Sequence, residues 1–173
     1  MPSLKKIVLG LLVLGVSLMA VELGKVPVKA TLFGENGGKI DGTVWNSSSL
    51  KGKVHILFYV DPDKKDLNKQ LSQALKAKNY PREKVNSVAM VNLKATWLPN
   101  IVLEALLKSK QKEFPYTLFV KDKEKVLVKK WNLEDDNSDI LIFNKEGKLI
   151  YKKFGKVSSN EIAKVISLIE KNL

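Results

Sequence analysis

Two aspartates that directly follow an apolar run are the residues of this sequence with the clearest capacity for chemistry. Asp61 and Asp63 come after residues 54–60, Val-His-Ile-Leu-Phe-Tyr-Val. A carboxylate pair at the carboxyl end of a buried strand could hold Mg²⁺ and supply a nucleophile, so a metal-dependent hydrolase is one hypothesis. Against it, Lys65 occupies a position that is threonine or valine in phosphatases with such a motif. The alternative is structural: Asp63 stabilises the start of a helix through capping and the helix dipole.

Other catalytic and metal-binding groups are scarce. His55 is the single histidine and lies inside the apolar run, which favours a hydrogen-bonded core residue over a ligand or a base. Ser47, Ser48 and Ser49 lack the glycines of a nucleophile elbow and would have to recruit that same histidine. Cysteine is absent, so thiol–disulfide chemistry is excluded for this chain acting alone. We expect no catalytic residue, no metal site and no cofactor.

The elements that would position these residues can be read from hydrophobic periodicity. The uninterrupted run 54–60 predicts a strand that is buried on both faces, in the middle of a sheet with parallel neighbours. A helix over about 67–80, a strand over 85–93 and a helix over about 99–112 follow. This β-α-β-α order implies parallel pairing through right-handed crossovers. The glycine-rich residues 21–42 predict short edge strands and turns.

The last third of the chain reads mainly as strands. Residues 117–120 and 125–131 flank a polar turn and are both predicted as strands. Residues 139–143 and 148–151 form the clearest hairpin, because Gly147 supplies the positive φ that its turn needs.

A final helix and three tryptophans complete the predicted core. Ser158 and Glu161 predict a capping box that opens the helix. Trp45, Trp97 and Trp131 lie at the ends of predicted elements, where we expect half-buried rings at the margin of the core.

The sequence is strongly basic, with 30 Lys and Arg against 18 Asp and Glu and a net charge of +12. Arg82 is the only arginine, which argues against base reading, so we expect no specific nucleic-acid partner. A nucleic-acid-binding transcriptional regulator is an alternative that rests on charge alone. Lysines around 121–130 and 145–156 are expected on neighbouring strands, as a basic face or as protection of sheet edges.

The N-terminal residues 1–20 are typical of a Sec-type signal peptide. Lys5 and Lys6 form its positive region, and an apolar stretch follows over residues 7–19, before a small residue for cleavage. The stretch is too short to cross a bilayer comfortably, so we expect no transmembrane span after cleavage, while retention as an N-terminal anchor stays open. We therefore predict an exported, periplasmic protein in which residues 21–173 form a single domain.

A parallel β-α-β core followed by an antiparallel hairpin and a closing helix is the order of a thioredoxin-like domain. Residues 45–46 (Trp-Asn), 50–54 (Leu-Lys-Gly-Lys-Val) and 142–147 (Ile-Phe-Asn-Lys-Glu-Gly) carry a further resemblance, together with the leader and the capped last helix. On these the chain resembles the YtfJ family of small exported bacterial proteins. The resemblance implies an α/β fold with a thioredoxin-like sheet, made of a central parallel β-α-β-α unit, a C-terminal antiparallel hairpin and a closing helix.

Thioredoxins carry a Cys-x-x-Cys motif after the first central strand, and the resemblance indicates where the corresponding site lies here. The candidate binding residues at this position are Asp61, Asp63, Lys64, Lys65, Ser138 and Asp139. The cis-proline usual in such folds is missing around residues 137–139, so a second element of the redox site is absent. The resulting hypothesis is a periplasmic thioredoxin-like protein with a non-enzymatic binding or scaffolding role, whose partner is an envelope protein or an anionic envelope component.

Overall fold

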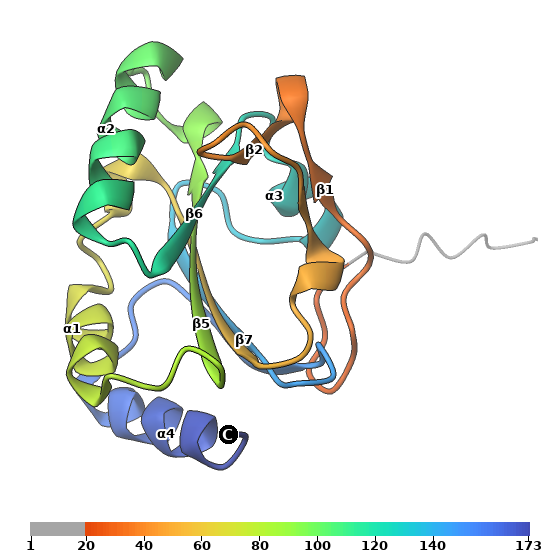
Figure 1. Ribbon diagram of the computed structural model, residues 1–173, viewed down its shortest axis with the longest axis vertical. Helices are drawn as coiled ribbons and strands as arrows, with labels where there is room; N and C mark the ends of the chain where they lie inside the picture. The colour runs from red at the N-terminus through yellow and green to blue at the C-terminus, as the bar shows by residue number, and fades with distance from the viewer. Residues whose placement is uncertain (1–19) are drawn as a thin grey trace, which may run out of the picture.

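The computed structural model describes residues 20–173, which form a six-stranded mixed sheet with helices on both faces (Figure 1). The predicted signal peptide, apart from its last residue, lies outside the described residues. The sheet has the strand order β2-β6-β5-β4-β7-β8. Its strands are β2 (Gly37–Lys39), β4 (Val54–Val60), β5 (Val85–Asn92), β6 (Thr117–Asp122), β7 (Ser138–Phe143) and β8 (Leu149–Phe154). A separate two-stranded ribbon pairs β1 (Thr31–Leu32) with β3 (Trp45–Asn46).

Helices lie in most of the connections between the strands of the described part of the chain. The α-helices are α1 (Lys69–Lys78), α2 (Asn100–Glu113), α3 (Val126–Trp131) and α4 (Ser159–Glu170). The 3₁₀ helices are η1 (Gly34–Asn36), η2 (Ser47–Ser49), η3 (Pro62–Lys64) and η4 (Leu93–Ala95). In Figure 1, α1, α2 and α4 lie on one side of the strands, whereas α3 and β1 lie on the other side. Within residues 20–173, no helix has the length and apolar character needed to cross a membrane.

Strand β4 lies inside the sheet, as its apolar sequence predicts. It pairs in parallel with β5 but antiparallel with β7, so the expectation of parallel neighbours holds on one side only. The antiparallel partner arises because the connection through α3 returns the chain to the carboxyl ends of the parallel strands before β7 begins. Leu57 and Tyr59 have no exposed surface, whereas Phe58 on the opposite face is only partly covered.

The face of the sheet beneath α3 and the N-terminal segment holds the larger apolar core. Tyr59 and Phe143 contribute to it from the strands, and Trp45 and Trp131 pack over them. The two indole rings meet edge to face, with their centroids 6.3 Å apart. Both are almost fully buried, whereas Trp97 is 86 % exposed, so the expectation of three half-buried rings is wrong.

The opposite face is covered by α1, α2 and α4. Helix α4 packs through Val165, in agreement with the apolar spacing of its segment. Helix α2 packs through Leu103 and Leu107 instead of the stripe of Ile101, Val102 and Leu106 that its apolar spacing favours, and these three residues are exposed. Helix α4 opens on the predicted capping box: Ser158 Oγ accepts from the backbone N–H of Glu161, and the Glu161 carboxylate accepts from the backbone N–H of Ser158. The strand and hairpin that precede this helix likewise follow the sequence prediction.

Residues 126–131 form helix α3 and not the predicted strand. Asp122, at the end of β6, accepts hydrogen bonds from the backbone N–H groups of Val126 at 2.9 Å and Leu127 at 3.0 Å. These bonds satisfy donors that the first turn of a helix leaves free, and Lys125 makes the preceding turn with a φ of 54°. The two lysine-bearing segments, residues 121–130 and 145–156, do not lie on neighbouring strands as expected, because three strands separate β6 from β8.

The outer edge of β6 is covered in two ways. Strand β2 pairs with Val120, Lys121 and Asp122. Before them along β6, Gln111 of α2 accepts from the backbone N–H of Phe119 through Oε1 at 3.3 Å, and it donates through Nε2 to the carbonyl of Thr117 at 2.9 Å. One amide side chain thus replaces a neighbouring strand at this edge.

Candidate functional site

Buried polar residues lie side by side where the central strands end. Asp61 follows β4, Asn92 ends β5 and Asp122 ends β6. The parallel register places Val60 beside Val91 and Asn92 beside Asp122, so the three polar residues form a row across the sheet. All three have no exposed surface, and they share the face covered by α3 because side chains alternate along a strand.

The carboxyl group of Asp61 is buried, and neither of its oxygens has a hydrogen-bond partner among residues 20–173. Its backbone is held firmly: the N–H donates to the carbonyl of Asn137 at 2.9 Å, and the carbonyl accepts from the N–H of Lys64 at 2.8 Å. Burial raises the pKa of Asp61 to about 6, because the charged carboxylate loses its hydration. The strand end therefore contains an acid that titrates close to neutral pH.

Asp139 of β7 is a second buried acid at the same place. It lies opposite Tyr59 in the β4–β7 pair, and its Oδ2 accepts from the backbone N–H of Glu134 at 2.9 Å. Its Oδ1 has no partner within the described residues. Burial raises the pKa of Asp139 to about 7, and the negative charges of Glu134 and Asp61 act in the same direction. Asp61 and Asp139 therefore influence each other's titration.

The geometry limits what these two acids can do. Neither has exposed surface, and a nucleophile or general base must lie within hydrogen-bonding reach of the substrate. Asp61 and Asp139 can hold protons inside the fold, but in this conformation they cannot meet a substrate. Their role in the observed arrangement is internal.

Asp122 is also buried, but its hydrogen bonds are complete. Besides the two backbone N–H groups at the start of α3, it accepts from the Tyr59 hydroxyl at 3.1 Å. Burial, followed by the charge of Asp122, raises the pKa of Tyr59, so this hydroxyl keeps its proton and stays a donor. The Asp122 carboxylate therefore joins β4, β6 and α3.

Ser138 is buried and serves the structure. The Asn68 side-chain amide donates to Ser138 Oγ at 3.0 Å and to the carbonyl of Gly155 at 3.1 Å, and its carbonyl accepts from the N–H of Val157 at 2.8 Å. This one amide links the start of α1 to β7 and to the segment before α4. Ser138 is thus part of an internal hydrogen-bond network.

Asp63, Lys64 and Lys65 lie at the surface of the strand end. Asp63 and Lys65 are exposed, and Lys64 is half-buried with its Nζ 3.9 Å from the carboxylate of Asp136. The N-cap of α1 is Asn68, so the expected capping of that helix by Asp63 is wrong. The physical reason is that η3 intervenes, and the helix begins six residues after Asp63.

The structure therefore separates the six candidate residues. Asp61, Ser138 and Asp139 come together in the interior, whereas Asp63 and Lys65 face solvent. Asp61 and Asp63 do not share a surface, and residues 20–173 contain no group of three or more His, Asp or Glu side chains placed to hold a metal ion. The hydrolase hypothesis finds no support in this geometry.

The connection from α3 to β7 closes the strand ends from outside. Asp135 accepts from Asn92 Nδ2 at 3.1 Å and forms an ion pair with Lys125. The hydrogen bond from Lys125 lowers the pKa of Asp135, so this carboxylate stays charged beside the two buried acids. The ion pair of Lys125 and Asp135 thus lies at the surface, outside the buried acids Asp61 and Asp139.

Sequence reasoning missed Asn68, Asn92 and Asp122. The predicted strand 117–120 stopped two residues before Asp122, and Asn68 stood inside the predicted helix as one polar residue among several. A polar residue at the end of each of two neighbouring parallel strands was the available signal for Asn92 and Asp122.

His55 is the hydrogen-bonded core residue that the sequence predicts. It is buried, its Nε2 lies 3.3 Å from the carbonyl of Lys51, and its Nδ1 lies 3.2 Å from Nδ2 of Asn86. Burial lowers the pKa of His55, which favours the neutral imidazole. The two ring nitrogens thus face Lys51 and Asn86 and not a serine. Ser47 Oγ accepts from the backbone N–H of Ala30.

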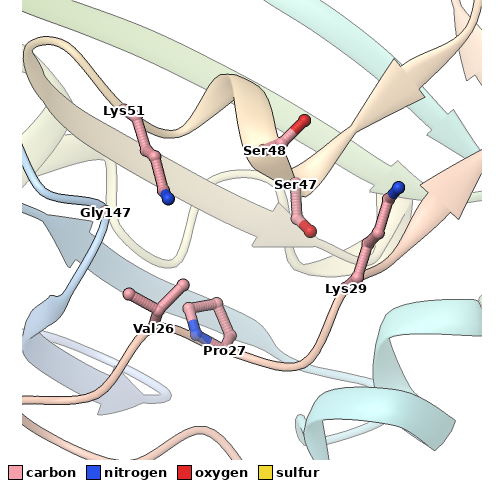
Figure 2. Close-up of a pocket in the computed structure, with 7 residues that line it drawn as sticks. All are labelled: Val26, Pro27, Lys29, Ser47, Ser48, Lys51 and Gly147. Atoms are coloured by element: carbon pink, nitrogen blue, oxygen red, sulfur yellow. The ribbon is translucent and has the colours of Figure 1, made fainter.

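A shallow pocket of about 140 Å³ lies at the opposite end of the sheet from the strand-end acids (Figure 2). Its lining consists of Val26, Pro27, Lys29, Ser47, Ser48, Lys51 and Gly147. The Lys51 stem lies against Gly147, where a Cβ would come within 2.9 Å of Lys51 Cγ. The contact between Lys51 and Gly147 places residues 50–54 beside the turn of the β7–β8 hairpin. This segment therefore connects the start of β4 to the hairpin.

The fold resembles known structures of the thioredoxin class. The crystal structure of the exposed lipoprotein thioredoxin of Streptococcus pneumoniae strain TIGR4 aligns with a TM-score of 0.57 and 16 % identity, covering 81 % of this chain and 98 % of that one. At this identity the likeness concerns the fold alone. The predicted α/β class with a thioredoxin-like sheet is confirmed.

Comparison of sequences identifies the family. The uncharacterised protein YtfJ of Escherichia coli (strain K12) is 27 % identical over 133 residues, which cover 75 % of this chain and 72 % of the relative. An uncharacterised protein of Haemophilus influenzae is 28 % identical over 158 residues, 87 % of this chain and 85 % of the relative. A family model described as "Bacterial protein of unknown function (YtfJ_HI0045)" matches residues 23–172. Because that match covers nearly every residue of the described fold, the chain belongs to the YtfJ family of bacterial proteins.

Proposed function

We propose that this chain is a non-enzymatic binding or scaffolding protein of the bacterial cell envelope, built on a thioredoxin-like domain without a redox site. The observation that carries the proposal is the complete burial of Asp61 at the strand end where the resemblance to thioredoxins places reactive cysteines. Disulfide exchange and hydrolysis both need an accessible nucleophile. The groups that a partner could contact at this strand end are instead the exposed side chains of Asp63 and Lys65.

The envelope location rests on the predicted signal peptide. Replacing Leu11 and Leu14 with aspartate should leave uncleaved precursor in the cytoplasm, because the apolar stretch would no longer enter the export channel. Fractionation of the native host, with mass spectrometry of the N-terminus, measures this. Wild-type protein that remains in the cytosol and keeps Met1 would overturn the location and favour the regulator alternative.

The binding surface that this proposal assigns is the exposed strand end around Asp63 and Lys65. A photo-crosslinking amino acid at position 65 should give light-dependent adducts with envelope components. Position 164 on α4 is the matched control, since Lys164 is also an exposed lysine. Equal adduct patterns at the two positions would contradict a specific surface at the strand end.

The hydrolase alternative is tested with the same purified protein. We expect no Mg²⁺-dependent shift of the melting temperature and no turnover of generic phosphate esters, since Asp61 has no exposed surface. A saturable Mg²⁺ shift that disappears in Asp61→Asn would overturn the proposal and identify an enzyme.

A further inference from the structure

An exposed apolar patch lies on helix α2 and on the turn that leads into it. Trp97 is 86 % exposed and Ile101 is 80 % exposed, and Leu106 and Val102 expose 54 % and 43 % of their surface. These four residues with Ala105 define the α2 patch. The helix itself packs on the sheet through Leu103 and Leu107, so the patch points away from the core. In Figure 1, α2 forms the outer margin of the molecule on its side of the sheet.

Positive charge continues the patch along the helix. Lys108 and Lys112 follow Ile101 and Ala105 at spacings of three and four residues, which places the four side chains on one stripe of the helix. Both lysines are exposed, and neither has a carboxylate within 4.0 Å among the described residues.

The acidic residues of α2 are neutralised by other lysines. Glu104 lies 2.8 Å from the Nζ of Lys123 and 3.5 Å from that of Lys121. Glu113 lies 2.6 Å from the Nζ of Lys110. The stripe from Trp97 to Lys112 therefore presents a tryptophan and aliphatic side chains followed by unpaired positive charge.

We propose that the α2 patch docks on an anionic phospholipid bilayer. Tryptophan is enriched at the membrane–water interface, where its ring is apolar on one side and its N–H can meet polar headgroups. Ile101 and Leu106 would enter the outer acyl region, and Lys108 and Lys112 would contact anionic headgroups. The inference deepens the proposed binding role and rests on it for the compartment in which the protein meets a membrane.

The composition favours a lipid surface over a protein partner. Protein interfaces are enriched in arginine and depleted in lysine, whereas the net charge of +12 comes from a chain whose only arginine is Arg82. Attraction to anionic lipids needs no bidentate geometry, and each lysine near the surface contributes independently. Lysines beside an exposed tryptophan fit such a surface.

Tryptophan fluorescence gives a direct test with the exported protein. Trp45 and Trp131 are buried, so a change in emission on adding lipid reports on Trp97. The sequence before residue 45 contains no tryptophan, so a retained leader would not contribute to the signal. Vesicles of phosphatidylglycerol and phosphatidylcholine should shift the emission to the blue. Vesicles of phosphatidylcholine alone should shift it much less.

Variants on the patch separate its apolar and charged parts. Ile101→Ser with Leu106→Ser should lower the vesicle partition coefficient at least tenfold. Lys108→Gln with Lys112→Gln should lower it by about fivefold per lysine, with a weaker salt dependence. Phe33→Ser, at an exposed aromatic residue next to β1, is the control for the apolar pair. Lys164→Gln on α4 with Lys171→Gln at its C-cap is the control for the lysines. All proteins must share one N-terminus, so that any contribution of the leader cancels.

The outcomes distinguish this inference from the proposed function. Unchanged Trp97 emission with anionic vesicles, or equal partitioning of the patch variants and the wild type, would overturn lipid docking. A crosslink from position 97 to an envelope protein, without a vesicle-induced shift, would overturn it in favour of a protein partner. Neither result would affect the strand-end crosslinks from position 65 that test the binding role itself.

Discussion

The carboxyl group of Asp139 lies diagonally across the β4–β7 pair from that of Asp61. Asp139 is in register with Tyr59, and Asp61 lies two residues further along the chain from that tyrosine. Both carboxyl groups are fully buried, and burial raises the pKa of Asp61 to about 6 and that of Asp139 to about 7. Two acids that are far apart in the sequence thus lie near each other in the interior, at the ends of paired strands.

The contribution of Asp61 and Asp139 to the stability of the fold should fall as the pH rises from 5 to 8. A carboxyl group whose pKa is higher in the folded state binds its proton more tightly there, and each pKa unit corresponds to about 1.4 kcal/mol. The stabilisation is complete below the unfolded pKa near 4 and is lost as the pH passes the folded values of Asp61 and Asp139. Urea unfolding at pH 5, 6, 7 and 8 measures this slope.

Substitution of the two acids should flatten that slope. Asp61→Asn and Asp139→Asn each remove one group that titrates between pH 5 and 8. Asp41→Asn is the matched control, because hydrogen bonds from Thr43 lower the pKa of this exposed carboxyl, which titrates below the range measured. A slope that is the same in all four proteins would show that the buried pair does not control the pH dependence.

Asp122→Ala should destabilise the protein by about 2–4 kcal/mol, because it leaves the Tyr59 hydroxyl and two N–H groups at the start of α3 without an acceptor. Asp122→Asn should cost less, since the amide keeps one acceptor oxygen. Chemical denaturation gives the magnitude, and near-ultraviolet circular dichroism of Trp131 reports on α3. A loss below about 0.5 kcal/mol would mean that α3 does not depend on this carboxylate.

Asn68→Ala and Asp63→Ala should differ strongly in their effect on stability, although both residues lie in the segment before α1. Asn68→Ala removes bonds to Ser138, Gly155 and Val157 inside the fold, and we expect a loss of about 2–3 kcal/mol. Asp63 is exposed and caps no helix, so Asp63→Ala should change stability by less than about 0.5 kcal/mol. Thermal and urea unfolding of both variants measure the contrast, and the reverse order would contradict the observed network.

Leu57→Ala should destabilise the protein more than Phe58→Ala, although the second substitution removes the larger side chain. Leu57 is fully buried in the core beneath α3, and emptying such a position costs about 2–5 kcal/mol. Phe58 is only partly covered, so solvent already shares its site. Equilibrium unfolding of the two variants decides the order, and a greater loss for Phe58→Ala would show that the face of β4 opposite α3 is the more tightly packed one.

Turn glycines and capping residues allowed several elements of this fold to be predicted from the sequence alone. Gly147 with its φ of 78° marks the β7–β8 turn, and the Ser158–Glu161 box opens α4 within one residue of the predicted start. Helix α3 was missed because Val126, Leu127 and Val128 suit a strand, although Asp122, whose carboxylate accepts from the first turn of the helix, precedes Val126 by only four residues.

The candidate site was predictable in position but not in arrangement. The run 54–60 located Asp61 at a strand end correctly. Its burial could not be predicted, because it depends on the connection from α3 to β7, where Asn137 accepts from the backbone N–H of Asp61 and Asp135 accepts from Asn92. The same long-range packing places Asp139 inside and leaves Asp63 in solvent.

The amide of Gln111 has a consequence for the solution behaviour of the protein. It occupies the backbone N–H of Phe119 and the carbonyl of Thr117, next to the apolar side chain of Leu118. If that amide were lost, an extended segment of a second molecule could add to the sheet at this edge, and growth by strand addition would have a starting point. A single glutamine side chain therefore protects this part of the sheet edge from the addition of a strand.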